Sequence, residues 1–345
     1  MCLIRVLWLL GCLWLLTGCT QREPLYSQES YVFGTRVEVV IYGAPQARAH
    51  AAATAVLAIF DRLHHRLHAW EPGELDQLNA AFAAGRTVPV APDLAAILRD
   101  ATADSQRSGE VFNPAIGNLI RLWGFESDHF EARLPDPAAI RALVARQPRM
   151  SDIVIRNGQA YSTNPWVRVD LGGYAKGYAL DRAAGILHKQ GIRNALINIG
   201  GNILALGQHG DRAWRVGIQH PRKPGALATL DLHDGEAIGT SGDYQRYFMI
   251  GNVRYCHLID PRSGYPMQGV QAVTILTRGP RAGVLSDADS KPLFISGTGG
   301  WRAAATRMGL SDAMLIDAQG VIHVTSSLNK RLEFADRSVH REVVP

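Results

Sequence analysis

The stretch Val169-Asp170-Leu171-Gly172-Gly173-Tyr174-Ala175-Lys176-Gly177 joins a predicted strand to a predicted helix. The strand covers residues 167–171, and the helix begins at Tyr174 and continues to about residue 189. Two glycines leave backbone N–H groups open at the start of the helix, where those groups and the helix dipole attract anions. An acid directly before such a turn repels phosphate, so we expect Asp170 to bond a hydroxyl, a ring N–H or a metal-bound water. By itself the turn is also compatible with a tight strand-to-helix connection that binds nothing.

Strands and helices are mixed on both sides of this stretch. Apolar spacing predicts helices over residues 46–68, 93–108, 137–146 and 301–308, with Gly109 as the C-cap of the second. Alternation predicts strands at 37–41 and 195–199 and hairpins over 153–161, 248–255 and 313–324, the first turning at Asn157-Gly158. There is no fixed-period repeat and no linker rich in Pro, Ser or Gly. We therefore expect an α+β fold, with one compact domain over residues 31–345 in which helices pack on mixed or antiparallel sheets.

The composition is that of an ordinary globular protein. Of 345 residues, 47% are hydrophobic and 19% are charged, which provides enough apolar material for a core. The net charge of +5 comes mostly from scattered arginines and not from a dense basic run. Nucleic acid is therefore a poor candidate for a partner.

The N-terminus has the features of a secretory signal. Arg5 precedes an apolar stretch at residues 6–16, followed by Leu16-Thr17-Gly18-Cys19. The stretch is too short for a membrane span, which needs roughly 20 apolar residues. Small residues before a cysteine resemble the lipobox of bacterial lipoproteins, which predicts a signal peptide over residues 1–18 and lipidation of Cys19. An ordinary signal peptide that happens to contain a cysteine is the alternative.

A lipidated Cys19 would anchor the chain on the periplasmic side of a bacterial membrane, with the inner membrane favoured and the outer left open. Residues 19–30 are polar and are interpreted as a tether. Cys2 and Cys12 would leave with the signal, so Cys256 would remain alone. This excludes an intramolecular disulfide and a cysteine-based metal site in the mature chain.

Histidines and acids suggest further chemistry. His257 follows an apolar strand, and Asp260 comes three residues later, an arrangement that suits a general base whose tautomer is fixed by a carboxylate. A structural histidine that caps a turn is the alternative. The three histidines His64, His65 and His68 invite a metal interpretation, but a solvated helix end is favoured because no other ligand type stands nearby.

Two more segments are candidates for a binding site. Phe112-Asn113-Pro114 leads to Trp123-Gly124-Phe125, and these aromatic residues either line a pocket for a flat ring or belong to the core. Asp287 and Asp289 precede an apolar run. Their oxygen atoms suit Mg²⁺, which needs few protein carboxylates, although Ser and Asp also cap helices routinely.

In this order, the segments resemble the ApbE family of FAD:protein FMN transferases, from about residue 32 to residue 310. The resemblance is carried by Phe33-Gly34-Thr35, Leu67-His68-Ala69-Trp70 through Leu78-Asn79, Phe112-Asn113-Pro114, Trp123-Gly124-Phe125, residues 170–176, Asn198-Ile199-Gly200-Gly201-Asn202, Thr240-Ser241-Gly242-Asp243-Tyr244 and residues 257–266. It implies that FMN moves from FAD to a Thr or Ser hydroxyl of a target redox protein, with release of AMP and with Mg²⁺ as cofactor. It also suggests an acceptor in a membrane redox complex of the Rnf or Nqr type, or a regulator of nitrous oxide respiration.

The resemblance implies roles for individual residues as well. The FAD site would comprise Phe33, Trp70, Val111, Phe112, Asn113, Asp170, Lys176 and Ile259. Asp287 and the carbonyl group of Gly173 would help to bind Mg²⁺ near the pyrophosphate. His257 is the candidate base for the incoming hydroxyl.

The chain departs from the family pattern at Lys291, where the family commonly has a Thr as metal ligand. An ammonium group has donors and no acceptor, so it does not coordinate Mg²⁺. Either Lys291 supplies fixed positive charge in place of a metal ion, or part of the metal site is lost and activity is weaker or different. The sequence therefore leaves two other functions open, a Mg²⁺-dependent FAD pyrophosphatase and a lipoprotein that binds FAD without chemistry.

Overall fold

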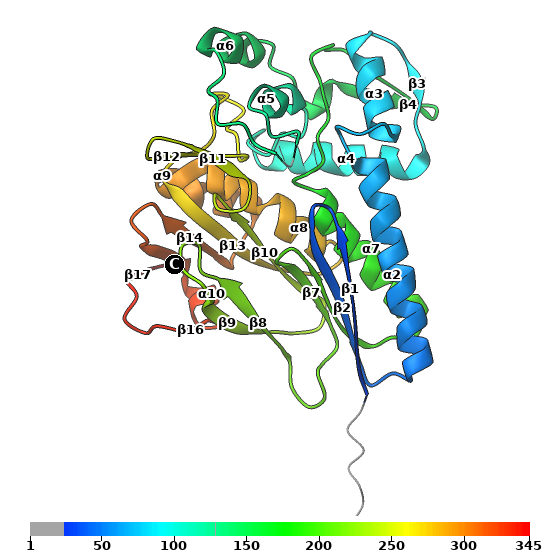
Figure 1. Ribbon diagram of the computed structural model, residues 1–345, viewed down its shortest axis with the longest axis vertical. Coiled ribbons are helices and arrows are strands. Elements are labelled where there is room, and N and C mark those ends of the chain that lie inside the picture. Colours follow the sequence, from blue (N-terminus) through cyan, green and yellow to red (C-terminus); the bar gives the residue numbers. More distant parts are fainter. Residues whose placement is uncertain (1–23, 128) are drawn as a thin grey trace, which may run out of the picture.

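A nine-stranded sheet forms the centre of the computed structural model (Figure 1), which describes residues 24–127 and 129–345. All neighbouring strands in this sheet are antiparallel except the last pair, β15 and β17. The strands in spatial order are β1 (Leu25–Val32), β2 (Thr35–Tyr42), β6 (Asn194–Ile199), β7 (Asn202–Leu206), β10 (Glu236–Gly242), β13 (Val270–Arg278), β14 (Ala313–Asp317), β15 (Ile322–Thr325) and β17 (Arg341–Val344).

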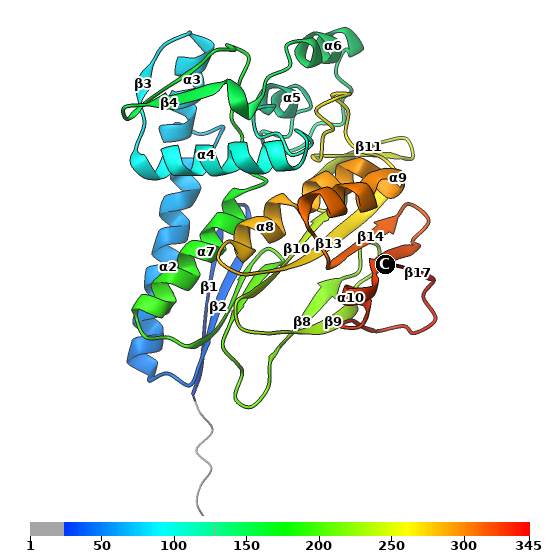
Figure 2. The same ribbon diagram turned by 180° about the vertical axis from the view of Figure 1, so that it is seen from behind.

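Four helices cover one face of this sheet (Figure 2). They are α2 (Gln46–Leu67), α7 (Ala175–Lys189), α8 (Ala282–Ala288) and α9 (Ser290–Met308). In α2 the buried side chains recur at helical spacing, as at Ala49, Ala53, Val56 and Phe60, and they form one core cluster with the inward side chains of β2 and β6. Helix α9 bends at Gly297, whose φ of 64° breaks the helical path.

A small sheet covers the opposite face. It consists of β16 (Glu333–Phe334), β9 (Ala226–Leu232) and β8 (Trp214–Gln219), and the short helix α10 (Ser326–Asn329) lies nearby. The alternating buried residues of β8 pack with apolar side chains of β7, β10, β13 and β14 in a second core cluster. The central sheet is therefore buried on both faces.

A third group of elements lies beyond the end of the central sheet, at the top of Figure 1. Its helices are α3 (Glu74–Ala83), α4 (Pro92–Arg107), α5 (Gly117–Leu122), α6 (Pro137–Ala145) and the 3₁₀ turn η2 (Met150–Asp152). Its strands are β3 (Val88–Pro89), β4 (Ile153–Arg156), β5 (Gln159–Ser162), β11 (Tyr247–Ile250) and β12 (Val253–Cys256). Helices α5 and α6 pack on β11 and β12 through a cluster that includes Trp123 and Phe248.

The predicted α+β class is confirmed, and so are most of the elements. Helices α2, α4, α6 and α7 match their predicted ranges to within a few residues, and the three hairpins form as expected. The turn between β4 and β5 places Asn157 and Gly158 at φ 51° and 70°, the left-handed region that this dipeptide tolerates. The helix predicted at 301–308 is only the second half of α9.

Two predictions about local structure are wrong. Residues 25–30, interpreted as part of a tether, belong to β1, which pairs with β2 along its whole length and carries mostly polar side chains because it is an exposed edge strand. Residues 167–171 form no strand beyond a single bridge between Arg168 and Ile116. Their backbone groups bond instead to the carbonyl groups of Ala115 and Pro114 and to the side chain of Asn79.

The predicted signal peptide and Cys19 lie outside the described residues. Within the described part of the chain, no helix combines the length and the apolar character that a membrane crossing requires. Cys256 is a buried free thiol.

Candidate active site

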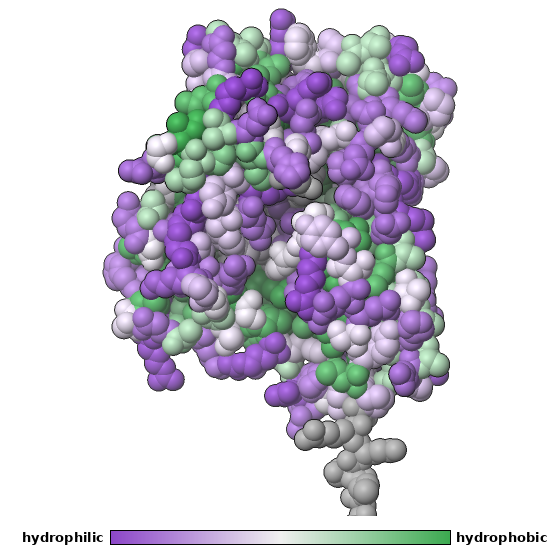
Figure 3. Space-filling view, in the orientation of Figure 1, coloured by the Kyte–Doolittle hydropathy of each residue, from purple (hydrophilic) through white to green (hydrophobic). Residues whose placement is uncertain are grey.

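A cleft of about 360 Å³ lies where the N-terminus of α7 faces the junction of α8 and α9. Figure 3 shows that the surrounding face is largely hydrophilic and is hollowed between the upper helices and the sheet. The cleft brings together twelve of the thirteen residues that the sequence proposed for FAD, metal or catalysis. These are Phe33, Trp70, Val111, Phe112, Asn113, Asp170, Gly173, Lys176, His257, Ile259, Asp287 and Lys291.

Asp170 organises the turn that leads into α7. One carboxylate oxygen accepts the N–H of Gly172 at 2.8 Å, and the other accepts the indole N–H of Trp70 at 3.1 Å. Burial raises the pKa of the Asp170 carboxyl, and these two hydrogen bonds oppose that rise. The ring N–H expected from the sequence is thus provided by Trp70, and the acid fixes the Trp70 ring at the edge of the cleft.

The segment before the turn is held by a side chain and not by a sheet. Asn79 of α3 donates to the carbonyl group of Val169 at 2.9 Å and accepts the N–H of Val169 at 2.7 Å. Its side chain thereby replaces a neighbouring strand, which explains why the residues before Asp170 are extended without ladder partners.

Helices α7 and α8 touch through glycines. A Cβ atom at Gly177 would lie 2.3 Å from the carbonyl oxygen of Gly283, and one at Gly283 would lie 2.5 Å from that of Gly177. Asp181 of α7 accepts the N–H groups of Gly283 and Val284 at 2.8 and 2.9 Å. Asp287 of α8 accepts the N–H of Gly177 at 2.9 Å. This close crossing brings Asp287 to the start of α7.

Lys291 is bound to Asp287 by two contacts. Its Nζ atom lies 2.7 Å from the carbonyl oxygen of Asp287 and 2.5 Å from Oδ1. The Lys291 side chain is 14% exposed and that of Asp287 only 1%. The stem of Lys291 runs beside Gly173, where a Cβ atom would lie 3.0 Å from Cε. The Lys291 side chain therefore bonds one residue that the sequence proposed as a metal ligand, Asp287, and lies beside the other, Gly173.

A magnesium ion does not fit these residues. Mg²⁺ would need oxygen ligands at about 2.0–2.1 Å, and Oδ1 of Asp287 is already bound to the ammonium group of Lys291 while Oδ2 accepts the N–H of Gly177. Over residues 24–127 and 129–345, no group of three or more His, Cys, Asp or Glu side chains is placed to hold a metal ion. The proposed ligand pair of Gly173 and Asp287 is therefore not assigned to a metal.

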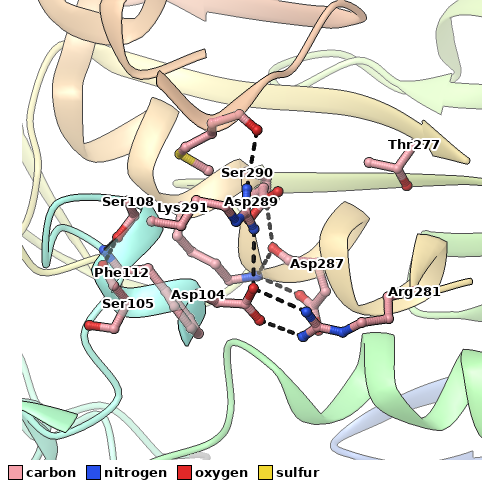
Figure 4. A network of polar contacts seen from close by, with 12 residues as sticks. Asp104, Ser105, Ser108, Phe112, Thr277, Arg281, Asp287, Asp289, Ser290 and Lys291 are labelled. Atoms are coloured by element: carbon pink, nitrogen blue, oxygen red, sulfur yellow. Dashed lines mark hydrogen bonds and ion pairs between the residues drawn. The ribbon is translucent and has the colours of Figure 1, made fainter. Parts of the chain in front are cut away.

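Ion pairs hold the segment that carries Asp287 and Lys291. Asp104 of α4 pairs with Arg281 at 2.6 Å, and Asp289 pairs with Arg107 of α4 at 2.7 Å. Figure 4 shows Lys291 pointing toward Asp287 beside the pair of Asp104 and Arg281. Asp104 and Asp289 are almost fully buried, and loss of Arg107 would remove the ion pair of Asp289, whereas Asp104 pairs with both Arg281 and Arg107. These pairs fix α8 and α9 against α4.

Aromatic side chains form the outer wall of the cleft. Phe33 stands at the tip of the turn between β1 and β2, with a φ of 57° that is rare for a bulky residue and is typical of functional positions. It packs on His64 at a centroid distance of 5.6 Å, and His68 packs edge-on against Trp70 at 5.3 Å. Of the three histidines expected at a solvated helix end, only His65 is exposed.

His257 lies at the inner end of the cleft. Its Nδ1 atom is 3.3 Å from the carbonyl oxygen of Arg246, so Nδ1 carries the proton and Nε2 is free to accept one. Burial lowers the pKa of His257 to about 3, with further lowering by the charges of Arg246, Lys176 and Lys291. The imidazole is therefore neutral near pH 7.

The prediction that Asp260 orients His257 is wrong. The Asp260 carboxylate bonds the backbone and the guanidinium of Arg262 at 2.9 Å in each contact, and it does not line the cleft. The Asp260 carboxylate accepts the N–H of Arg262, two residues later, in a local Asx-type turn. This carboxylate is therefore bound within its own turn and not to the ring of His257. The carbonyl group of Arg246 takes the orienting role.

Arg246 is the main residue of the cleft that the sequence analysis missed. Its guanidinium lies 5.3 Å from the Trp70 ring centroid and donates to the carbonyl groups of Phe125 and Ser127. Together with Lys176 and Lys291 it gives the cleft three cationic side chains, beside the carboxylates of Glu71, Asp170 and Asp287. Burial lowers the pKa of Lys176, and Asp287 opposes this shift. The only available signal was the position of Arg246 two residues after Tyr244, just beyond a segment that carries the family resemblance.

The fold and the cleft define an α+β protein whose site combines an aromatic wall, a helix N-terminus and three cationic side chains, a combination that suits a flat ring joined to a diphosphate. The model of the ApbE family matches residues 33–315, and the chain belongs to that family. Two relatives named FAD:protein FMN transferase are similar over most of this chain. The protein of Rhodobacter capsulatus is 41% identical over 91% of this chain, and that of Treponema pallidum is 33% identical over 79%.

The chain spans 60% of the length of the Rhodobacter relative and 78% of the Treponema relative. Among solved structures, the ApbE protein of Thermotoga maritima is similar with a TM-score of 0.81 and 27% identity, over 89% of this chain and 99% of that one. The apo form of the Pseudomonas stutzeri flavinyl transferase ApbE gives a TM-score of 0.79 and 25% identity, over 90% and 98%. The expected family resemblance is confirmed.

Proposed function

We propose that this protein is an FAD:protein FMN transferase. The observation that carries the proposal is the meeting of an aromatic wall with the N-terminus of α7 and the cations Lys176, Arg246 and Lys291 in one cleft. The isoalloxazine of FAD stacks at Trp70, and the diphosphate lies at the glycine turn beside Lys176 and Lys291, whose positive charge favours it. Relatives that share the family carry the same activity in their names.

The reaction is a phosphoryl-type transfer. A Thr or Ser hydroxyl of the acceptor attacks the phosphorus of the FMN half, the bond to the bridging oxygen breaks, and AMP leaves with that oxygen. His257 accepts the proton of the incoming hydroxyl at Nε2. Lys176 and Lys291 offset the charge on the diphosphate oxygens, so that most of the catalysis comes from positioning and fixed charge. No step is assigned to Mg²⁺, because Lys291 engages the carboxylate that would hold it.

Mass spectrometry of an acceptor domain incubated with the protein and FAD tests the proposal. We expect the acceptor to gain the mass of one FMN group on a Thr or Ser, and AMP to appear in equal amount. Cleavage of FAD without any gain in acceptor mass would instead identify a pyrophosphatase. FAD that stays intact after prolonged incubation would identify a binding protein without chemistry.

Replacement of Trp70 by alanine is expected to weaken FAD binding by about 5- to 150-fold, because stacking on an aromatic side chain contributes about 1–3 kcal/mol. Trp70→Phe keeps a ring for stacking and loses only the bond to Asp170, so its loss should be smaller. The measurement is quenching of flavin fluorescence on titration with protein. Trp166→Ala is the matched control, because Trp166 is 39% exposed and lies outside the cleft. Equal affinities for Trp70→Ala and Trp166→Ala would exclude Trp70 from the flavin site.

The location and the acceptor are part of the same proposal. Lipidation of Cys19 after removal of residues 1–18 would place the cleft on the periplasmic side of the membrane, where the acceptor is a domain of a membrane redox complex or a regulator of nitrous oxide respiration. The support is the run of small residues before Cys19. Intact mass of the membrane-extracted protein should show an acylated chain that begins at Cys19, whereas Cys19→Ala should keep the unprocessed mass; a wild-type chain without added lipid mass would refute lipidation.

A further inference from the structure

The ammonium group of Lys291 lies in the cleft beside Asp287 and Gly173, the two residues that the sequence proposed as metal ligands. It is held from two sides, by the carbonyl oxygen and by Oδ1 of Asp287, and its stem lies against Gly173. Asp287 is itself fixed, because its second carboxylate oxygen accepts the N–H of Gly177 on the neighbouring helix. The charge therefore has a fixed place between α7 and the junction of α8 and α9.

The surroundings of Lys291 favour an anion and not a second cation. Lys176 and Arg246 line the same cleft, and together with Lys291 they lower the pKa of His257. Three carboxylates also line the cleft: Asp287 is paired with Lys291, Asp170 accepts the N–H groups of Gly172 and Trp70, and Glu71 is more than half exposed. A divalent ion at Asp287 would lie within a few ångströms of the ammonium group, and two cations that close repel strongly in a partly buried site. A diphosphate placed there meets fixed positive charge instead.

We propose that Lys291 replaces the divalent cation, so that the protein binds the diphosphate of FAD and transfers FMN without a metal ion. This inference rests on the proposed function for the transfer step, whereas its binding step stands independently. Unlike Mg²⁺, a fixed ammonium group does not have to bind from solution and lose hydration water in each turnover. One ammonium group offsets less of the negative charge of the diphosphate than Mg²⁺ does, and Lys176 and Arg246 supply the additional positive charge.

The test compares wild type, Lys291→Thr and Lys291→Met in EDTA and in Mg²⁺. FAD affinity is measured by flavin fluorescence, and retention of Mn²⁺ by electron paramagnetic resonance in the presence of FAD. Wild-type affinity is expected to change by no more than about twofold between EDTA and Mg²⁺, and wild type should retain no Mn²⁺. Lys291→Thr should bind FAD at least about tenfold more weakly in EDTA, recover in Mg²⁺, and retain Mn²⁺.

Lys291→Met removes the charge without adding an oxygen ligand, so Mg²⁺ should not rescue it. Its transfer rate is expected to fall by about 10²–10³-fold, as when one fixed donor to a developing charge is removed. Lys189→Thr is the matched control, because Lys189 is exposed at the far end of α7, and it should behave as wild type. Thermal unfolding of each variant separates a folding defect from loss of charge.

The outcomes distinguish this inference from the proposed function. Wild-type FAD affinity that rises about tenfold or more with Mg²⁺, or Mn²⁺ held by wild type with FAD, would overturn the role of Lys291. A second outcome is that FAD binds without metal, that Lys291→Met loses this binding, and that no FMN is found on any acceptor. This result would support Lys291 as the cation that binds the diphosphate, and it would contradict only the transferase activity.

Discussion

Replacement of His257 by alanine is expected to slow FMN transfer by about 10²-fold, the low end of the contribution of a positioned general base, because a lowered pKa makes the ring a weak base. The carbonyl oxygen of Arg246 holds the proton on Nδ1, which leaves Nε2 unprotonated in a cleft that also contains Lys176. FAD affinity should change little, because the expected contacts of the ring are with the acceptor hydroxyl. Single-turnover transfer to an acceptor domain measures the first effect, and flavin fluorescence measures the second.

The pH dependence provides a second readout for His257. Its pKa is lowered to about 3, so the neutral form that accepts a proton persists far below the ordinary range of histidine. The wild-type transfer rate should therefore show no acid limb near 6.5 and should hold down to about pH 5. His188→Ala, which changes an exposed histidine of α7, is the matched control. Near wild-type transfer by His257→Ala would remove His257 from the mechanism.

Replacement of Gly177 by alanine is expected to lower the free energy of unfolding by about 3 kcal/mol, through overpacking against backbone. The added Cβ would lie 2.3 Å from the carbonyl oxygen of Gly283 and 2.7 Å from Cα of Val284, and neither atom is a flexible side-chain end. Helices α7 and α8 would have to separate. That movement would also draw Asp287 and Lys291 away from the start of α7, so FAD affinity should fall with stability.

Gly185→Ala on the same helix is the control for Gly177→Ala. Among the described residues, a Cβ at Gly185 meets nothing within 4 Å, so alanine should stabilise the protein by about 0.5–1 kcal/mol through helix propensity alone. Urea unfolding of both variants gives the comparison. If Gly177→Ala were as stable as Gly185→Ala, the close crossing of α7 and α8 would be wrong, and with it the placement of Asp287.

The sequence predicts elements best where one face of a regular element is buried. The spacing of Ala53, Val56 and Phe60 predicts α2, and Asn157-Gly158 predicts the hairpin of β4 and β5, because burial and turn geometry act locally there. The pattern of residues does not predict strand β1, because its side chains are mostly exposed and polar. Its only evidence is the pairing with β2 in the structure.

The first half of α9 is not predicted from the sequence, for a different reason. Its serines and the kink at Gly297 hide the helical pattern, although this half carries Lys291.

Prediction of the candidate site also succeeds where the chemistry depends on local sequence and fails where it depends on tertiary contacts. Residues next to glycine turns, such as Asp170 and Lys176, are predicted because their chemistry depends on the local backbone. The partner of His257 is not predictable from spacing, since Asp260 satisfies its own turn and the orienting group is the carbonyl oxygen of Arg246. The sequence shows that Lys291 stands where the family commonly has a metal ligand, but not what its ammonium group contacts. The structure shows that contact, because Lys291 and Asp287 meet across one turn at the junction of α8 and α9.

A crystal structure of the protein with FAD, grown in EDTA, tests the central claim most directly. The diphosphate should lie between the turn at Gly172 and the side chain of Lys291, within hydrogen-bond distance of that ammonium group, with the flavin ring against Trp70. A flavin bound elsewhere on the molecule, or a diphosphate that lies away from both the turn and Lys291, would contradict it.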